Sequence, residues 1–395
     1  MEFKSALKLY CPAKVSNWGK KAEESIIAKF SPQSKNDDLL AEFWMGTHPS
    51  NPALVEVGGQ KITLNDLIKQ EPREILGENI STKFNNELPF LFKILSINTA
   101  LSIQAHPNKM LAAELRKKNP TQYPDSNHKP EMGIALTEVE LLYGFAKYEK
   151  IKNSLELVEE FRNLLSEQTL EKVKIGSNDY LKSVLTDVMR ADKDIIKVES
   201  QKLYQRLSQK NNLSPQERWI LKLSGDFPEG DVGIFGFYIL DFYKLMPDEA
   251  VFIGPNIAHA YLSGDVIECM ACSDNVVRAG LTPKFQDVDT LLQMLDYKVD
   301  SLTIIKPESH SGLSTYKTPA TEFAISKLDF SAKQVVLNQE QLPAILLCLG
   351  GEAEIVVNSN LQSIKEGEVY FFPHSLNQVK INSDSAEIFI ANVPN

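Results

Sequence analysis

Two short strings carry side chains that could bind a metal ion: SIQAHPNK, which begins at Ser102, and DSNHKPE, which ends at Glu131. If the first string is a strand, its alternate side chains Ser102, Gln104 and His106 face one side. An amide oxygen, an imidazole and a carboxylate make three of the four ligands of a zinc site. Taken alone, the pattern is also typical of a half-buried strand with satisfied polar residues.

A fourth ligand is available at His259, where a turn rich in Pro and Asn leads into a strand on which His259 and Tyr261 share a face. The phrase before it, VFIGP from Val251, resembles VYFFP from Val369. Repeated strand-then-proline phrases suit two jelly-roll (cupin) barrels. Four residues after the proline, the second copy has Asn377 in place of histidine, so metal is expected in the first barrel only. A histidine in the core stays the alternative.

The next string, VIECMACSDNVVRAGLTPKF, brings acidic and basic groups together. Glu268 lies among apolar strand residues, where burial raises the pKa of a carboxyl group and suits it to proton transfer. Arg278 follows two valines and is expected at a pocket mouth. These groups could form the local basic pocket that an anionic substrate needs in a chain of net charge −10. A structural ion pair between Glu268 and Arg278 is the alternative.

The elements that position these residues fall into several domains, because 395 residues are too many for one small core. Short apolar runs broken by Gly, Pro and Asn predict a mainly β fold, interrupted by a stretch with helical spacing. Ser214 and Glu217 form a capping box that opens one of these helices. The predicted parts are a β domain with the candidate ligands in two segments, 1–145 and 230–311, a helical domain, 146–229, and a C-terminal jelly roll, 312–395.

The composition excludes several functional classes. The negative net charge argues against nucleic acid or an anionic membrane surface as the main partner. No apolar run approaches the roughly 18 residues that span a bilayer, and the N-terminal sequence lacks the apolar core of a signal peptide. Four cysteines are too few for a disulfide scaffold. A cytoplasmic protein is expected.

The chain closely resembles the type I mannose-6-phosphate isomerases (phosphomannose isomerases), zinc enzymes of the cupin superfamily, over nearly its whole length. The matching phrases are NWGK (17–20), AEFWMGTHPS (41–50), LPFLFKILSINTALSIQAHPNK (88–109), YPDSNHKPEM (123–132), ELLYGF (140–145), AHAYLSGD (258–265) and SDNVVRAGLTPKF (273–285). The resemblance implies a catalytic cupin domain interrupted by a helical domain and followed by a C-terminal jelly roll, in a protein expected to be a monomer.

The resemblance also assigns roles to residues. It implies one Zn²⁺ per chain, held by Gln104, His106, Glu131 and His259. It places the substrate and its phosphate against Trp18, Lys93, Ser102, Lys109, Tyr261 and Lys284. It places catalysis at Lys129, Glu268 and Arg278, and His128 is added to this catalytic set because it adjoins Lys129 next to the ligand loop.

The implied reaction interconverts mannose 6-phosphate and fructose 6-phosphate through an enediol. Glu268 is the preferred base at C1 and C2, His128 and Lys129 are an acid–base pair for ring opening, and Arg278 is expected to bind phosphate or enediolate oxygens. Two other classes stay open: an iron-dependent cupin dioxygenase, which usually has a histidine-richer ligand set, and a catalytically silent sugar-phosphate-binding regulator. The physiological direction of the reaction, toward mannose activation or breakdown, is also left open.

Overall fold

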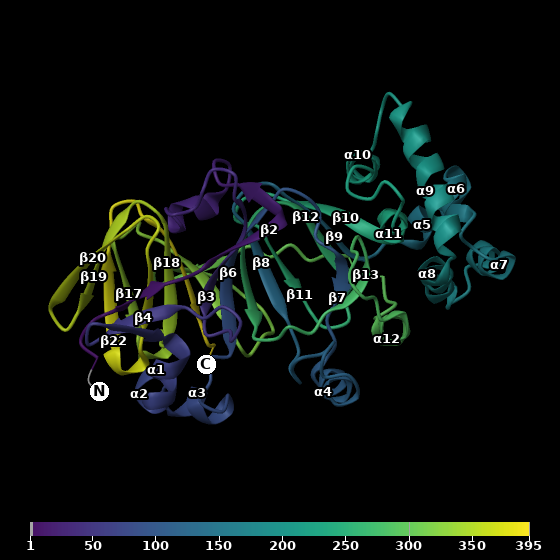
Figure 1. Ribbon diagram of the computed structural model, residues 1–395. Helices are drawn as coiled ribbons and strands as arrows, with labels where there is room; N and C mark the ends of the chain where they lie inside the picture. Colours follow the sequence, from purple (N-terminus) through teal and green to yellow (C-terminus); the bar gives the residue numbers. More distant parts are fainter. Residues whose placement is uncertain (1–2, 300, 395) are drawn as a thin grey trace.

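The computed structural model describes residues 3–299 and 301–394, which form three parts in a row (Figure 1). A β barrel with the predicted metal ligands lies in the middle, between a helical part and a jelly roll built largely from the C-terminal residues. The described ends of the chain both lie at the jelly roll. The expected mainly β fold with a helical insertion is confirmed.

The middle barrel is a ten-stranded sheet in which β12 is the longest strand, with 13 residues. The first part of β12 pairs with β7 and β9, and its second part pairs with β6 and β8, so this one strand joins both walls of the barrel. The strands are β2 (Ala13–Lys21), β3 (Leu39–Gly46), β6 (Phe90–Ile97), β7 (Ile103–Ala105), β8 (Glu131–Ala135), β9 (Val139–Phe145), β10 (Leu240–Leu245), β11 (Ala250–Ile253), β12 (His259–Ala271) and β13 (Val277–Gly280).

The helical part packs its own apolar core against one end of the barrel. Its helices are α5 (Tyr148–Leu157), α6 (Glu159–Arg162), α7 (Glu167–Ile175), α8 (Tyr180–Arg190), α9 (Lys193–Ser208), α10 (Pro215–Leu223) and α11 (Gly233–Ile239). The predicted capping box opens α10: Ser214 Oγ accepts the Glu217 amide N–H at 3.2 Å, and Glu217 Oε2 accepts the Ser214 amide N–H at 2.8 Å. Helical spacing continues past Leu157, but Val158 has an extended backbone, which separates α5 from α6.

The third part packs a nine-stranded sheet against a four-stranded one, as in a jelly roll. The larger sheet contains β14 (Glu308–His310), β15 (Leu313–Tyr316), β16 (Ala324–Leu328), β18 (Ala344–Gly350), β21 (Val369–Phe372) and β23 (Glu387–Asn392). It also contains β1 (Leu7–Tyr10), β4 (Leu54–Val57) and β5 (Gln60–Thr63). The smaller sheet contains β17 (Gln334–Asn338), β19 (Glu352–Val357), β20 (Asn360–Lys365) and β22 (Gln378–Asn382). Although β1, β4 and β5 precede residue 145, they lie in this sheet, so the jelly roll draws on both ends of the chain.

Short helices complete the fold. They are η1 (Ile26–Phe30), α1 (Leu64–Gln70), α2 (Pro72–Leu76), α3 (Glu78–Lys83), α4 (Lys109–Lys118), α12 (Val288–Met294), η2 (Gln339–Gln341) and η3 (His374–Leu376). Within residues 3–299 and 301–394, no helix combines the length and the apolar character needed to cross a membrane.

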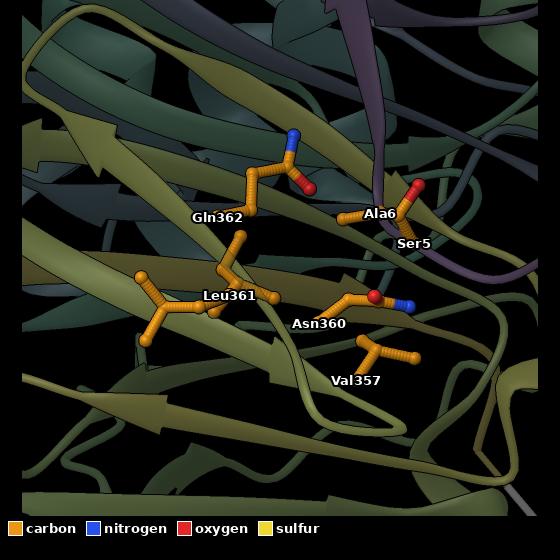
Figure 2. Close-up of a pocket in the computed structure, with 7 residues that line it drawn as sticks. Ser5, Ala6, Val357, Asn360, Leu361 and Gln362 are labelled. Atoms are coloured by element: carbon orange, nitrogen blue, oxygen red, sulfur yellow. The ribbon is translucent and has the colours of Figure 1, made fainter.

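A small cavity of about 210 Å³ lies where the N-terminal segment crosses the smaller sheet (Figure 2). It is lined by Ser5, Ala6, Ile355, Val357, Asn360, Leu361 and Gln362. The Asn360 side-chain amide donates to the Lys4 carbonyl oxygen at 3.1 Å, which holds the N-terminal segment against β20. Because none of the lining side chains titrates, the cavity offers no group for acid–base catalysis.

Candidate metal and substrate site

Three of the four predicted metal ligands meet in the interior of the middle barrel. His106 follows β7, Glu131 is the first residue of β8, and His259 is the first residue of β12. The Nε2 atoms of His106 and His259 lie 3.4 Å from Glu131 Oε1 and Oε2 respectively. All three side chains are buried, and their ligand atoms lie within 4.8 Å of one another. This spacing could hold one metal ion.

The hydrogen bonds of the two imidazoles fix which nitrogen is free. His106 Nδ1 lies 2.8 Å from the Asn275 carbonyl oxygen, and His259 Nδ1 lies 2.9 Å from that of Ile257. A carbonyl can only accept, so each Nδ1 carries the proton and each Nε2 presents a lone pair. Both Nε2 atoms are buried without a hydrogen-bond partner among the described residues. Imidazoles oriented in this way are typical metal ligands.

Gln104, the fourth predicted ligand, lies on β7 between two functional neighbours. Its cross-strand partners are His259 on β12 and Arg278 on β13. Neighbours of this kind have Cβ atoms roughly 5 Å apart and point to the same face of the sheet. Gln104 also lines the large cavity in front of the cluster, so it is placed to add an amide oxygen. Its role as a ligand stays a prediction.

Electrostatics hold the cluster in its metal-binding protonation state. Burial alone would raise the pKa of Glu131, but Lys129 Nζ lies 3.0 Å from Oε1 and lowers that pKa well below its usual range. Burial lowers the pKa of His106 to about 4. The carboxylate and this neutral imidazole are the forms that bind metal.

The cavity in front of the cluster has a volume of about 920 Å³, large enough for a sugar phosphate. Of the predicted site residues, it is lined by Trp18, Lys93, Ser102, Gln104, Lys129, Glu131, Tyr261, Glu268, Arg278 and Lys284. The other four do not line it: His106 and His259 lie in the buried cluster, and Lys109 and His128 lie elsewhere. Lys109 is an exposed residue at the start of α4. His128 turns toward the C-terminal jelly roll, where its Nε2 lies 2.7 Å from Glu322 Oε1.

Glu268 lies deep in the cavity as part of a buried charge chain. Lys93 Nζ lies 3.2 Å from Glu268 Oε2 and 3.3 Å from Glu42 Oε2, which also accepts the Trp44 indole N–H at 2.7 Å. Burial raises the pKa of Glu268 even though Lys93 opposes the change. The expected apolar setting of Glu268 is therefore found, but its ion-pair partner is Lys93 rather than Arg278.

Arg278 is half-buried at the cavity wall, and burial lowers its pKa. In the part of the chain that the structure describes, no carboxylate forms an ion pair with Arg278 or Lys284. The structural ion pair considered for Arg278 is therefore not found among the described residues. Two cations without counter-ions, one half-buried and one at the exposed rim, are available to an anionic ligand.

Tyr261 points its hydroxyl into the same region. The Tyr261 hydroxyl is buried and has no hydrogen-bond partner among the residues described, and burial raises its pKa well above the usual range. Gly133 on β8 makes room for it, because a Cβ at that position would overlap the hydroxyl oxygen. The hydroxyl thus fills the space that Gly133 leaves on β8.

The helical part closes one side of the cavity with the loop between α10 and α11. Asp226, Phe227, Gly230 and Asp231 of this loop line the cavity. Asp231 Oδ1 accepts the backbone N–H groups of Gly233 at 2.7 Å and Leu281 at 2.6 Å, which fastens the loop to the end of β13. Reasoning from the sequence missed Asp231, as it missed Glu42 and Trp44. Their roles depend on partners distant along the chain, although AEFWMG was among the matching phrases.

Comparisons with known proteins agree with this geometry. Family models described as the catalytic domain and the helical insertion domain of type I phosphomannose isomerase match residues 6–148 and 154–240. A model described as the cupin domain of mannose-6-phosphate isomerase matches residues 313–392. A probable mannose-6-phosphate isomerase of Dictyostelium discoideum is 37% identical over 425 residues, covering 98% of this chain and 93% of that protein. The mannose-6-phosphate isomerase of Rattus norvegicus is 38% identical over 377 residues, covering 88% of each.

Solved structures are similar along the whole chain. A zinc-bound mannose 6-phosphate isomerase superposes with a TM-score of 0.86 at 27% identity, covering 98% of this chain and 100% of that one. A variant of phosphomannose isomerase from Salmonella typhimurium gives a TM-score of 0.88 at 26% identity, covering 99% and 100%. The middle barrel, which surrounds a buried His–Glu–His cluster, defines a metal-binding protein of the cupin class. Within that class, the chain belongs to the type I phosphomannose isomerase family.

Proposed function

We propose that this protein is a zinc-dependent aldose–ketose isomerase that interconverts D-mannose 6-phosphate and D-fructose 6-phosphate. The observation that carries the proposal is the buried His106–Glu131–His259 cluster, whose two Nε2 atoms have no hydrogen-bond partner among the described residues. It lies next to a cavity whose lining includes two cations, Arg278 and Lys284, that form no ion pair within the described part of the chain. The names of the relatives support the reaction, and the zinc-bound structural relative supports the metal.

The ligand set suits zinc that activates a substrate. His106, His259 and Glu131 would hold the ion, and Gln104 would complete a set with only one anionic ligand. Because only one ligand is anionic, a bound Zn²⁺ ion and its ligands would together keep a net positive charge. A zinc ion bound there would supply Lewis acidity toward the carbonyl oxygen of the sugar.

Glu268 is the group best placed to move the proton between C2 and C1 through a cis-enediol. It lines the cavity, and burial makes it a stronger base than an exposed carboxylate. Lys93 at 3.2 Å fixes its orientation. Glu131 is a poorer candidate, because its oxygens face both imidazoles and Lys129.

The remaining groups divide between ring opening and substrate binding. Lys129 and the unpaired Tyr261 hydroxyl line the cavity and can exchange protons or hydrogen bonds with sugar oxygens. Arg278 is the cross-strand neighbour of Gln104, so it suits sugar oxygens near the metal, whereas Lys284 at the rim suits the phosphate. Trp18 and Ser102 complete the wall. The geometry gives no support to the roles predicted for His128 and Lys109.

Two measurements on the purified protein test the proposal. Elemental analysis should find about one zinc per chain, and a coupled assay should detect fructose 6-phosphate formed from mannose 6-phosphate. Iron with oxygen consumption, or sugar-phosphate binding without turnover, would contradict it.

We also propose that the protein acts as a monomer in the cytoplasm. Its four cysteines, Cys11, Cys269, Cys272 and Cys348, are all free thiols, as expected in a reducing compartment. Size-exclusion chromatography with light scattering should give the 44.3 kDa mass of one chain, and imaging of the tagged protein should show a cytoplasmic signal. A dimer mass or an organellar signal would count against the respective statement.

A further inference from the structure

Two loops behind the metal-ligand cluster are fastened to each other through Asp125. Its Oδ1 accepts the amide N–H of Asn127 at 2.8 Å, the hydroxyl of Ser273 at 2.9 Å and the side-chain amide of Asn275 at 3.0 Å. Its Oδ2 accepts the amide N–H of Asp274 at 2.8 Å. The Asn275 side chain also donates to the carbonyl oxygens of Asp125 at 2.9 Å and Asn127 at 3.0 Å.

Each of these loops leads to a part of the candidate metal site. The first loop, which contains Asp125, runs directly into Glu131. The second loop carries the Asn275 carbonyl oxygen, which accepts the proton of His106 Nδ1 at 2.8 Å. Both His106 and Asn275 are 0% exposed, so water cannot replace this acceptor. The position of one carbonyl group therefore decides which His106 nitrogen is free.

We propose that Asp125 is a positioning residue for the metal centre, which keeps the Asn275 carbonyl against His106 and holds the loop that delivers Glu131. The inference rests on the metal site of the proposed function. A carboxylate that accepts four hydrogen bonds across two loops restricts both of them, and charged acceptors form the stronger hydrogen bonds. Groups that orient a ligand histidine typically contribute 10–100-fold to metal affinity.

The test is Asp125→Ala, with zinc affinity measured by competition against a chromogenic chelator of known affinity. We expect zinc to bind about 10–100-fold more weakly. Nitrogen-15 NMR of the metal-free variant should show that His106 no longer occupies only the Nδ1–H form, a change that general destabilisation does not produce. Ser126→Ala, an exposed neighbour in the same loop, is the matched control and should leave affinity and spectrum unchanged.

A folded Asp125→Ala variant with wild-type zinc affinity and wild-type His106 signals would overturn the inference. If that variant does not fold, Asp125→Asn decides, because it retains one acceptor oxygen and puts an NH₂ group in place of the other. An unchanged affinity and spectrum in Asp125→Asn would then overturn it. A wild-type protein that binds no zinc would contradict the proposed function instead, and the metal-free His106 spectra would still decide this inference.

Discussion

At the scale of single residues, the site is built from buried charges that share partners. Lys93 contacts both Glu42 and Glu268, and these carboxylates raise its pKa against the effect of burial. Glu268 nevertheless keeps a raised pKa, because burial outweighs its one close cation. This combination leaves a basic carboxylate held in a fixed place.

The first prediction concerns Glu268→Gln. This nearly isosteric change removes the base, so turnover should fall by about 10²–10⁴-fold while zinc content stays at the wild-type level. The coupled assay and elemental analysis measure the two quantities. Glu42→Gln is the control, because it alters the other carboxylate partner of Lys93 and should cost far less. Near-normal turnover in Glu268→Gln would shift the role of base to Lys129.

The second prediction concerns the pH dependence of the metal-free protein. Burial lowers the pKa of His106 to about 4, whereas an ordinary histidine titrates near about 6.5. Between these values the unfolded chain binds a proton that the folded chain does not, so the free energy of unfolding falls as the pH falls. The loss should be about 3 kcal/mol by pH 4.

Urea unfolding of chelator-treated protein between pH 7 and pH 4 measures this loss. His106→Gln, which cannot titrate in this range, should show a shallower decline. Equal slopes in the two proteins would show that His106 is not the group responsible.

At the scale of elements, successive side chains of an extended segment point to opposite faces, and this alternation determines which residues contact one another. Lys129 and Glu131 are two residues apart and contact each other, whereas His128, directly before Lys129, reaches Glu322 on the other side. The alternation applied to Ser102, Gln104 and His106 also predicts the buried positions of Ile103 and Ala105 between them.

The third prediction concerns Gly133 on β8, which leaves room for the side chain of Tyr261 on β12. Gly133→Ala would press a Cβ against the Tyr261 hydroxyl, so it should lower stability by about 1–3 kcal/mol and reduce kcat/KM at least tenfold. Denaturant unfolding and the coupled assay measure these effects. Tyr261→Phe removes the obstructing oxygen, so the double variant should regain much of the lost stability. Its failure to do so would place the clash elsewhere.

Sequence patterns indicated candidate metal ligands but not their surroundings. Strand alternation made His106 a candidate, ligand chemistry added Glu131 and His259, and the family resemblance selected them; the structure brings these three side chains together. The role of the Asn275 carbonyl could not be predicted, because every residue has a carbonyl group and only the pairing of strands shows which one faces His106. His128 was predicted to act together with Lys129 because the two are adjacent in the sequence. Its partner in the structure is Glu322, which lies 194 residues away along the chain.

At the scale of the whole molecule, the three parts share strands and interfaces rather than standing apart. β1 pairs with β21 through Leu7 opposite Phe371 and with β4 through Leu9 opposite Val55. The His128–Glu322 contact also joins the loop before Glu131 to the C-terminal jelly roll. The jelly roll therefore stabilises the chain that forms the site without lining the large cavity.

The fourth prediction tests this connection through Leu9, which is buried in β1. Leu9→Ala should lower the free energy of unfolding by about 2–5 kcal/mol, because it leaves a cavity between sheet neighbours from both ends of the chain. Urea unfolding followed by fluorescence measures the change. Leu361→Ala, the same substitution at a position 63% exposed, should change stability by less than about 0.5 kcal/mol. Equal effects would show that β1 contributes little to the core.

During protein synthesis, β1 cannot pair with β21 until the later strand has been made. β1 leaves the ribosome about 360 residues ahead of its partner at Val369–Phe372. At roughly 5–20 residues per second, this delay lasts about 20–70 s. Until then one edge of β1 has unpaired backbone groups, which can pair with another nascent chain. Premature termination before Val369 should therefore leave β1 permanently without this partner, even in a chain that contains every predicted zinc ligand.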